Sequence, residues 1–287
     1  MERISRTLST VAVVALLALT SAVPASAQYF GQNKVQYDDF DWRVINTEHF
    51  DLHFYLGAEE ASLEMARAAE RWNARISALF EYELSEIKPI VMYANHPDFQ
   101  QTNIIGGEIG LGTGGVTDAA RNRATQPYTA DFNSTMHVVG HELVHVFQYD
   151  LASRGPGVAG MSRLPLWVIE GMAEYVSVGR VDPHTAMWVR DAVLREDIPT
   201  VSDLSSGRYF PYRYGQALLA YIGGRWGDAA VVQLYRIGIE RGVEAAIAEV
   251  TGLSSEELSE AWAEELRETY LPVLDGRQAP ADVGRLV

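Results

Sequence analysis

Cysteine is absent from the 287 residues of this sequence. Its absence excludes a cysteine nucleophile, thiolate metal ligands and disulfide bonds, so the apolar core must hold the fold together. Basic residues are also scarce. The chain has 23 lysines and arginines against 38 aspartates and glutamates, which gives a formal net charge of −15. A chain this acidic is repelled by nucleic acid and by anionic lipid, so neither is expected as a partner.

Long apolar runs are equally rare, and the one near the N-terminus has the features of an export signal. Arg3 and Arg6 precede the short apolar run 11–19, and small residues at 25–27 form a cleavage site before Gln28. The run is too short to span a membrane, and no other run is long enough. We therefore expect a signal peptide over residues 1–27 and an exported mature protein without a membrane span, located in the periplasm or outside the cell.

Hydrophobic patterning predicts strands and one long helix in the first half of the mature chain. The segment HFDLHFY (49–55) alternates as a half-buried strand does, and PIVMYA (89–94) is typical of a buried strand. Apolar residues recur at helical spacing over 57–80. The glycine-rich segment 104–118 predicts strands joined by tight turns, and GLGTGG (110–115) within it predicts an edge strand beside a cleft.

Helical patterns dominate the rest of the chain. A helix is expected over 134–150, with Ser134 able to cap it. Further helices are expected over 166–179, 214–227, 228–242, 243–252 and 254–270. The last of these opens with the capping box Ser254 and Glu257.

The segment HELVHVFQ (141–148) places two histidines four residues apart on the helix predicted over 134–150. A helix turns by about 100° per residue, so His141 and His145 share one face and can bind one metal ion. Glu142 lies about 100° round from His141, where it cannot easily bind that ion but can reach a water molecule beside it. This division suits a zinc hydrolase, although the pattern arises by chance in about one such chain in a hundred.

The segment LPLWVIEGMAEY (164–175) supplies a third candidate ligand. Glu170 lies 25 residues after His145 in an otherwise apolar run, and Glu174 follows one helical turn later. Buried carboxylates are costly unless they are paired or bind a metal ion. Glu170 would complete a His-His-Glu site with an open fourth position, and Glu174 would accept a hydrogen bond from a ligand histidine. The alternative places both glutamates on a solvated helix face.

HELVHVFQ followed by PLWVIEGMAEY resembles the thermolysin-like (gluzincin) metallopeptidases. In that group the glutamate of a W-x-x-E-G segment is the third zinc ligand, so the resemblance implies that Glu170, rather than Glu174, binds the one zinc ion per chain. The segment PYRYGQALLAYI (211–222) resembles the part of the aminopeptidase branch that carries the transition-state tyrosine. Tyr212 and Gly215 fall on its tyrosine and glycine.

The mature chain also resembles the N-terminal peptidase-like region of large exported bacterial proteins that continue into a β-propeller, whereas this sequence ends at Val287. The predicted fold class is α+β and gluzincin-like, in a single metallopeptidase-like domain over 28–287. A small mixed sheet with a long helix is expected in 28–133. The active-site helix and a mainly helical lobe are expected in 134–287.

A tyrosine near Pro211 is expected to stabilise the oxyanion of the reaction. Pro211 suits the first turn of a helix, which would put Tyr212 at the helix start facing the cleft. Tyr214 is the weaker alternative, because it aligns with Leu218 and Tyr221 in a stripe typical of core packing. A third possibility is that all these tyrosines only pack.

Two classes of function fit this sequence. The first is a zinc metallopeptidase that cleaves a peptide or protein substrate through a zinc-bound water, with Glu142 as general base. The second is a zinc-containing, non-catalytic binding domain that acts in envelope assembly. The intact Glu142 favours the first, since a structural site needs no base. His137, four residues before His141, is assigned a structural role near the site.

Overall fold

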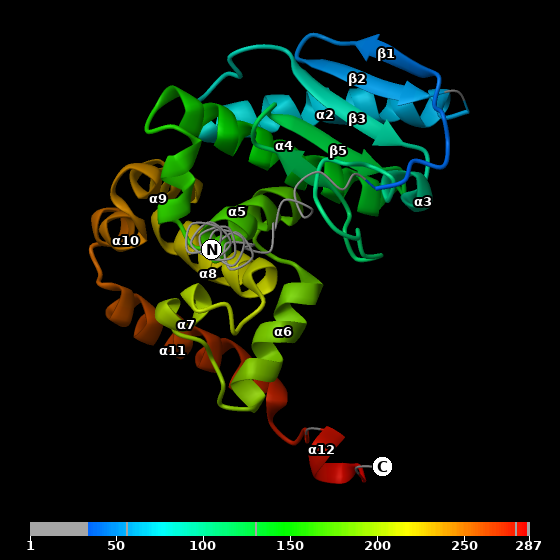
Figure 1. Ribbon diagram of the computed structural model, residues 1–287. Coiled ribbons are helices and arrows are strands. Elements are labelled where there is room, and N and C mark those ends of the chain that lie inside the picture. The colour runs from blue at the N-terminus through cyan, green and yellow to red at the C-terminus, as the bar shows by residue number, and fades with distance from the viewer. Residues whose placement is uncertain (1–33, 56, 130, 279, 286–287) are drawn as a thin grey trace, which may run out of the picture.

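A computed structural model of the chain describes residues 34–55, 57–129, 131–278 and 280–285. The expected signal peptide lies outside these residues. Within them, five strands form one mixed sheet in the order β1-β2-β3-β5-β4. The strands are β1 (Trp42–Asn46), β2 (Phe50–Tyr55), β3 (Lys88–Tyr93), β4 (Val116–Asp118) and β5 (Arg123–Pro127). Figure 1 shows the sheet at one end of the molecule and most of the helices at the other.

The centre of the sheet is parallel and its two edges are antiparallel. β3 pairs in parallel with both β2 and β5, whereas β1 and β4 run antiparallel to their neighbours. Helix α2 (Glu59–Phe80) packs against β2, and helix α4 (Phe132–Arg154) packs against β5 and β4. Leu52, Ile90 and Ala124 belong to the same buried cluster as residues of these helices. The alternation that predicted β2 is confirmed, since Phe50, Leu52 and Phe54 are buried.

Two local expectations were wrong. The glycine-rich segment 104–115 forms turns and irregular structure, and only Val116–Asp118 after it is a strand. Repeated glycines supply no side chains that could pack on a sheet, so the strand begins where they end. Helix α4 is capped by Asp131 rather than Ser134, because the Asp131 carboxylate accepts a hydrogen bond from the Ser134 N–H at 2.7 Å.

The remaining chain is helical, and its capping box at Ser254 and Glu257 is present. The other helices are α3 (His96–Phe99), η2 (Val158–Arg163), α5 (Leu166–Val178), α6 (Pro183–Leu194), α7 (Val201–Ser205), α8 (Pro211–Trp226), α9 (Asp228–Arg241), α10 (Val243–Thr251), α11 (Ser255–Leu274) and α12 (Pro280–Val283). None of the helices in the described part of the chain combines the length and apolar character that crossing a membrane requires. The predicted α+β class, with a small mixed sheet before a mainly helical half, is confirmed.

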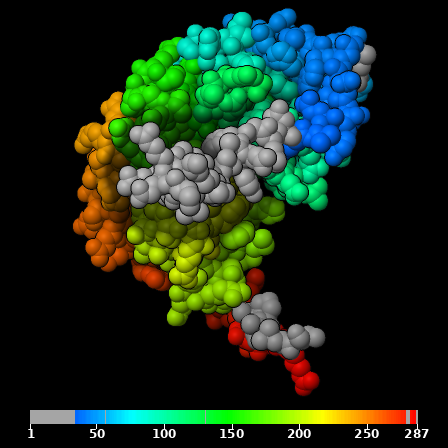
Figure 2. All heavy atoms as spheres, in the orientation of Figure 1, coloured from blue at the N-terminus to red at the C-terminus, as the bar shows by residue number. Residues whose placement is uncertain are grey.

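Two glycines let helices α5 and α8 approach each other closely. A Cβ atom on Gly215 would lie 2.4 Å from the carbonyl oxygen of Trp167, and one on Gly171 would lie 2.6 Å from the Gly215 carbonyl carbon. Any larger residue at either position would push the helices apart. Figure 2 shows blue and cyan residues of the first part of the chain along the top of the molecule, with orange residues of the helical half at the left and yellow ones below.

A buried ion pair fixes the second half of α4 to the sheet. Lys88 Nζ, at the start of β3, lies 2.6 Å from Asp150 Oδ1, and both side chains are almost fully buried. The same carboxylate accepts hydrogen bonds from the Tyr82 hydroxyl at 2.8 Å and from the Ser85 N–H at 2.9 Å. Burial alone would raise the pKa of Asp150, but its contacts with Lys88, Ser85 and Tyr82 lower it. Asp150 is therefore ionised in the folded protein.

The variant Asp150→Asn is expected to destabilise the fold by about 3 kcal/mol, because it leaves the Lys88 ammonium buried without its main counter-charge. Urea unfolding at pH 7 measures the change. Asp191→Asn is the matched control, since it breaks the exposed pair of Asp191 with Arg195 and should cost far less. Equal losses in the two variants would show that the buried pair contributes nothing special.

Candidate metal centre and active site

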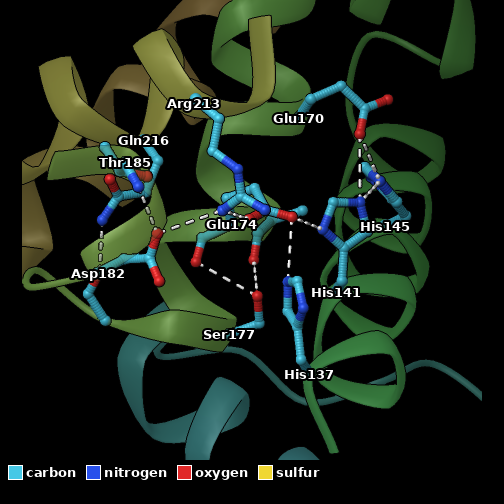
Figure 3. Close-up of polar contacts among 12 residues, drawn as sticks. His137, His141, His145, Glu170, Glu174, Ser177, Asp182, Thr185, Arg213 and Gln216 are labelled. Atoms are coloured by element: carbon cyan, nitrogen blue, oxygen red, sulfur yellow. Dashed lines mark hydrogen bonds and ion pairs between the residues drawn. The ribbon is translucent and has the colours of Figure 1, made fainter. Parts of the chain in front are cut away.

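Helices α4 and α5 bring three of the predicted site residues together. His141 Nε2 and His145 Nε2 lie 3.2 Å apart, and each lies 3.2 Å from Glu170 Oε2. The side chains of His141, His145 and Glu170 are 10%, 9% and 16% exposed. Figure 3 shows Glu170 reaching from α5 towards the two imidazoles, which lie edge-to-face one turn apart on α4. The solvated-face alternative for Glu170 does not fit this burial.

The three converging atoms fit a metal ion better than they fit one another. Three ligand atoms bound to one tetrahedral ion at 2.0–2.1 Å lie about 3.3–3.4 Å apart, close to the 3.2 Å found here. Hydrogen bonds alone satisfy this triangle poorly. If both histidine nitrogens carry a proton for Glu170, the two N–H groups face each other, and if one lacks it, one contact with Glu170 loses its donor. A cation at the centre would accept all three lone pairs.

The electrostatics of the cluster show how strongly its members interact. Burial alone would lower the pKa of His141, but its contacts with Glu170 and Glu174 raise it to about 10. Burial also opposes the charge on Glu170, yet the two histidines hold the pKa of its carboxyl well below the usual value. The pKa of His145 is raised against the effect of burial, chiefly by Glu170. The direction of these shifts shows that the two histidines and the carboxylate of Glu170 stabilise one another's charged forms.

Glu174 lies at the centre of a second group of contacts. Its carboxylate accepts hydrogen bonds from His137 Nε2 at 3.1 Å and from Arg213 Nη1 at 2.9 Å. His141 Nδ1 lies 3.0 Å from Glu174 Oε1, although the ring is poorly aligned for a hydrogen bond. The structure thus places Glu174, at 4% exposure, against the far nitrogen of a candidate ligand, and the predicted hydrogen bond from His141 stays a prediction.

His137, His141 and Glu174 could also hold a metal ion as a trio. That trio is the weaker metal site. Arg213 already places a positive charge against Glu174, and that charge would repel a second cation. His141 can bind one ion through Nε2 while Nδ1 keeps its proton for Glu174, but binding two ions would require a doubly deprotonated ring. The structural role predicted for His137 agrees with its contact with Glu174.

Gln148 orients the second histidine and was not predicted. Its amide nitrogen donates to the carbonyl of Ile169 at 3.1 Å, which leaves its oxygen facing His145 Nδ1 at 2.8 Å. His145 Nδ1 must therefore carry the proton, and the Nε2 lone pair is free to bind a metal ion. The signal was present in the sequence, since Gln148 is the last residue of HELVHVFQ. The Gln148 amide is oriented by the Ile169 carbonyl, which lies next to it only because α5 packs on α4.

Glu142 lies next to the triangle but is not part of it. Its carboxylate accepts a hydrogen bond from the Thr117 hydroxyl of β4 at 2.6 Å. The backbone of Gly115 passes so close that a Cβ atom there would lie 2.7 Å from Glu142 Oε1 and Cγ. The glycine stretch 110–115 was expected to lie beside a cleft. At Gly115 the space next to the backbone is occupied by the side chain of the candidate base.

A cavity of about 460 Å³ opens beside the triangle formed by His141 Nε2, His145 Nε2 and Glu170 Oε2. His141, Glu142 and Tyr212 are among its lining residues, with glycines of the 112–115 stretch on another wall. The Tyr212 ring stacks on His141, with centroids 5.7 Å apart and planes at 11°. Helix α8 begins at Pro211, as the prediction for Tyr212 assumed.

Tyr214 points elsewhere. It is 8% exposed and packs edge-on against Trp188 and Tyr209. Leu218 and Tyr221, its partners in the predicted stripe, are buried as well. This placement favours Tyr212 over Tyr214 as the tyrosine that a substrate in the cavity could meet.

Comparisons with known proteins agree with the resemblance found in the sequence. Residues 106–214 match a family described as "BSP: Peptidase of plants and bacteria". Among solved structures, a mutant of the M1 zinc metallopeptidase from Deinococcus radiodurans is similar at 14% identity and a TM-score of 0.40. The likeness covers 84% of this chain and 53% of that one, so this chain spans about half of that protein's length. A search of curated proteins gives no significant match.

The matched segment includes α4, α5 and Tyr212. The match supports the predicted resemblance to a peptidase over this segment. The resemblance to the N-terminal region of exported proteins that continue into a β-propeller stays a prediction.

Gln148→Leu is expected to weaken metal binding by about 10–100-fold, because it removes the acceptor that fixes the His145 ring. Glu174→Ala should have an effect of similar size through His141. Titration of the metal-free protein with zinc, read by calorimetry, measures both affinities. His145→Ala is the reference for loss of a ligand and should abolish tight binding. Unchanged affinity in Gln148→Leu and Glu174→Ala would mean that neither residue orients a ligand.

Proposed function

We propose that the protein is a zinc-dependent metallopeptidase that hydrolyses peptide bonds in a peptide or protein substrate. One observation carries the proposal: two imidazole nitrogens and one carboxylate oxygen converge at 3.2 Å, directly beside the carboxylate of Glu142 and a cavity. The peptidase family match over this segment supports it.

The donor set favours zinc, with one ion per chain. Two neutral imidazoles and one carboxylate, all buried, are the ligand types of catalytic zinc sites that keep one position open. His141, His145 and Glu170 would hold the ion. When bound, zinc would polarise the substrate carbonyl and acidify a water molecule. Protein groups must then move the proton and stabilise the charge that develops on the substrate.

Glu142 is assigned the proton transfer. Its carboxylate lines the cavity next to His141, where it can take a proton from the attacking water and pass it to the leaving amine. Helix geometry separates this role from metal binding, because Glu142 points about 100° away from His141 around the helix axis. The base therefore faces the substrate while its neighbour faces the ion.

Tyr212 is assigned the stabilisation of the oxyanion. Burial and the negative charge of Glu170 raise the pKa of its hydroxyl above the ordinary value, so Tyr212 remains a neutral O–H donor at physiological pH. Its ring is held against His141 at the edge of the cavity. A donor at this place can meet the negative charge that develops on an attacked carbonyl oxygen.

Export is part of the proposal. The basic start, short apolar run and small-residue cleavage site of residues 1–27 support delivery of the mature protein to the periplasm or the exterior. A peptidase that lacks cysteine has no thiol to be oxidised there.

Glu142→Gln should retain one zinc ion and the native fold but lose about 10²–10⁴-fold in turnover, since glutamine keeps the shape and cannot accept a proton. Cleavage of a broad peptide library, with metal content measured on the same samples, tests this. Turnover within a few-fold of wild type would remove Glu142 as the base. If zinc-loaded wild type cleaves nothing either, a non-catalytic binding domain becomes the better description.

Tyr212→Phe should lower kcat by about 10²–10³-fold with zinc and fold retained, because it removes one oxyanion donor. Tyr214→Phe is the matched control, as it removes a hydroxyl from the same helix turn in the core. Steady-state kinetics on one peptide substrate would compare them. A loss in Tyr214→Phe alone would assign the donor to Tyr214, and no loss in either would place the donor outside this segment.

A further inference from the structure

The hydroxyl of Thr117 makes the closest polar contact with the candidate base. Thr117 lies in the middle of the edge strand β4, 25 residues before Glu142. Its Oγ1 lies 2.6 Å from Glu142 Oε2 and 3.1 Å from the Glu142 backbone oxygen. A contact between a strand and the side chain of a helical residue depends on tertiary packing, so it is a property of this fold rather than of the HExxH sequence.

Counting protons assigns the direction of this contact. A threonine hydroxyl has one proton, so it can donate to only one of the two Glu142 oxygens. The backbone oxygen of a residue inside a helix already accepts the N–H four residues later. An ionised carboxylate is also the stronger acceptor, and the shorter distance is to Oε2. The hydroxyl therefore donates to Oε2.

The other carboxylate oxygen remains available to the cavity. Within the described residues, Glu142 Oε1 accepts no hydrogen bond, while Glu142 as a whole is 95% buried and lines the cavity. Gly115 closes one side, since its backbone leaves no space for even a methyl group against Oε1 and Cγ. The carboxylate thus has one oxygen held by β4 and one oxygen without a partner.

We propose that Thr117 is a positioning residue for Glu142: its hydroxyl fixes the carboxylate so that Oε1, rather than Oε2, is the oxygen that takes the proton. The contact itself stands on geometry, and its catalytic consequence rests on the proposed peptidase function. Thr117 acts through Glu142 and touches neither the metal ligands nor the substrate in this assignment.

Kinetics test the consequence. Thr117→Val replaces the hydroxyl by a methyl group of similar size and should lower kcat by about 10–100-fold with KM little changed, because the base loses its fixed orientation. Thr117→Ser keeps the hydroxyl and should restore most of the loss. Metal content should remain one ion in both. A kcat for Thr117→Val near that of wild type, or a loss that serine does not restore, would overturn the positioning role.

Thr125 offers a matched control on the neighbouring strand β5. It is fully buried, and its hydroxyl has no hydrogen-bond partner within the described residues. Thr125→Val therefore makes the same chemical change in the same sheet without touching Glu142, and kcat should stay at the wild-type value. A similar drop in both variants would mean that any substitution in the sheet disturbs the site, and would count against Thr117 specifically.

A stability measurement on metal-free protein tests the contact without relying on activity. Thr117→Val should lower the melting temperature by about 4 °C in the wild-type background, since it removes a hydrogen bond to a charged group. In the Glu142→Ala background the same change should have little effect. Equal shifts in both backgrounds would overturn the proposal. If zinc-loaded wild type proves inactive, the peptidase function fails, while this cycle still decides whether Thr117 holds Glu142.

Discussion

The contact between α5 and α8 at Gly171 and Gly215 is the constraint on which the candidate site depends. The two backbones touch there, and no side chain fits between them. Glu170 directly precedes Gly171, and Tyr212 lies one turn before Gly215. The contact therefore brings the Glu170 carboxylate to both histidines of α4 and the Tyr212 ring against one of them, His141. The absence of side chains at Gly171 and Gly215 is therefore needed to place Glu170 and Tyr212 in the site.

Charge compensation ties the same three helices together. Glu174 of α5 is buried, Arg213 of α8 places a positive charge against its carboxylate, and His137 and His141 of α4 contact the same carboxylate. Removing Arg213 would leave the Glu174 carboxylate buried without its permanent counter-charge, which is destabilising. Arg213 is the neighbour of Tyr212 in the chain. The ion pair that neutralises Glu174 thus also holds the helix turn that presents the tyrosine to the cavity.

Sequence alone predicted the parts of the site that follow from local geometry. The shared face of His141 and His145 follows from the pitch of a helix, and the acidic residue in an apolar run indicated that Glu170 is buried. The position of Thr117 could not be predicted in this way, and neither could the orientation of the Gln148 amide, which depends on the Ile169 carbonyl of α5. Thr117 reaches the base only because of how β4 pairs with β5 and packs on α4. The residues around Thr117 carry no pattern that predicts how β4 pairs with β5.

The helices and strands also separate into those that local patterning predicts and those that it misses. Strand β2 and the long helix α2 were predicted because burial on one face leaves a periodic pattern. Strand β1 was missed, since its burial is low on both faces and the sequence carries no alternation. Strand β5 was missed for the opposite reason, because most of it is buried although it contains threonine and glutamine. The threonine and glutamine are buried because the neighbouring strands and helices cover them, which local patterning does not report.

The two histidines are oriented by different partners before any ion binds. His145 donates from Nδ1 to a neutral amide, Gln148, whereas His141 Nδ1 faces the carboxylate of Glu174. Both arrangements turn Nε2 towards Glu170, so the fold itself prepares the triangle. A small zinc domain gains its fold from the metal. Here the helices α4, α5 and α8 contribute residues to one large apolar core, and burial of that core stabilises the fold independently of the site, so metal removal should abolish metal-dependent chemistry while leaving the helices in place.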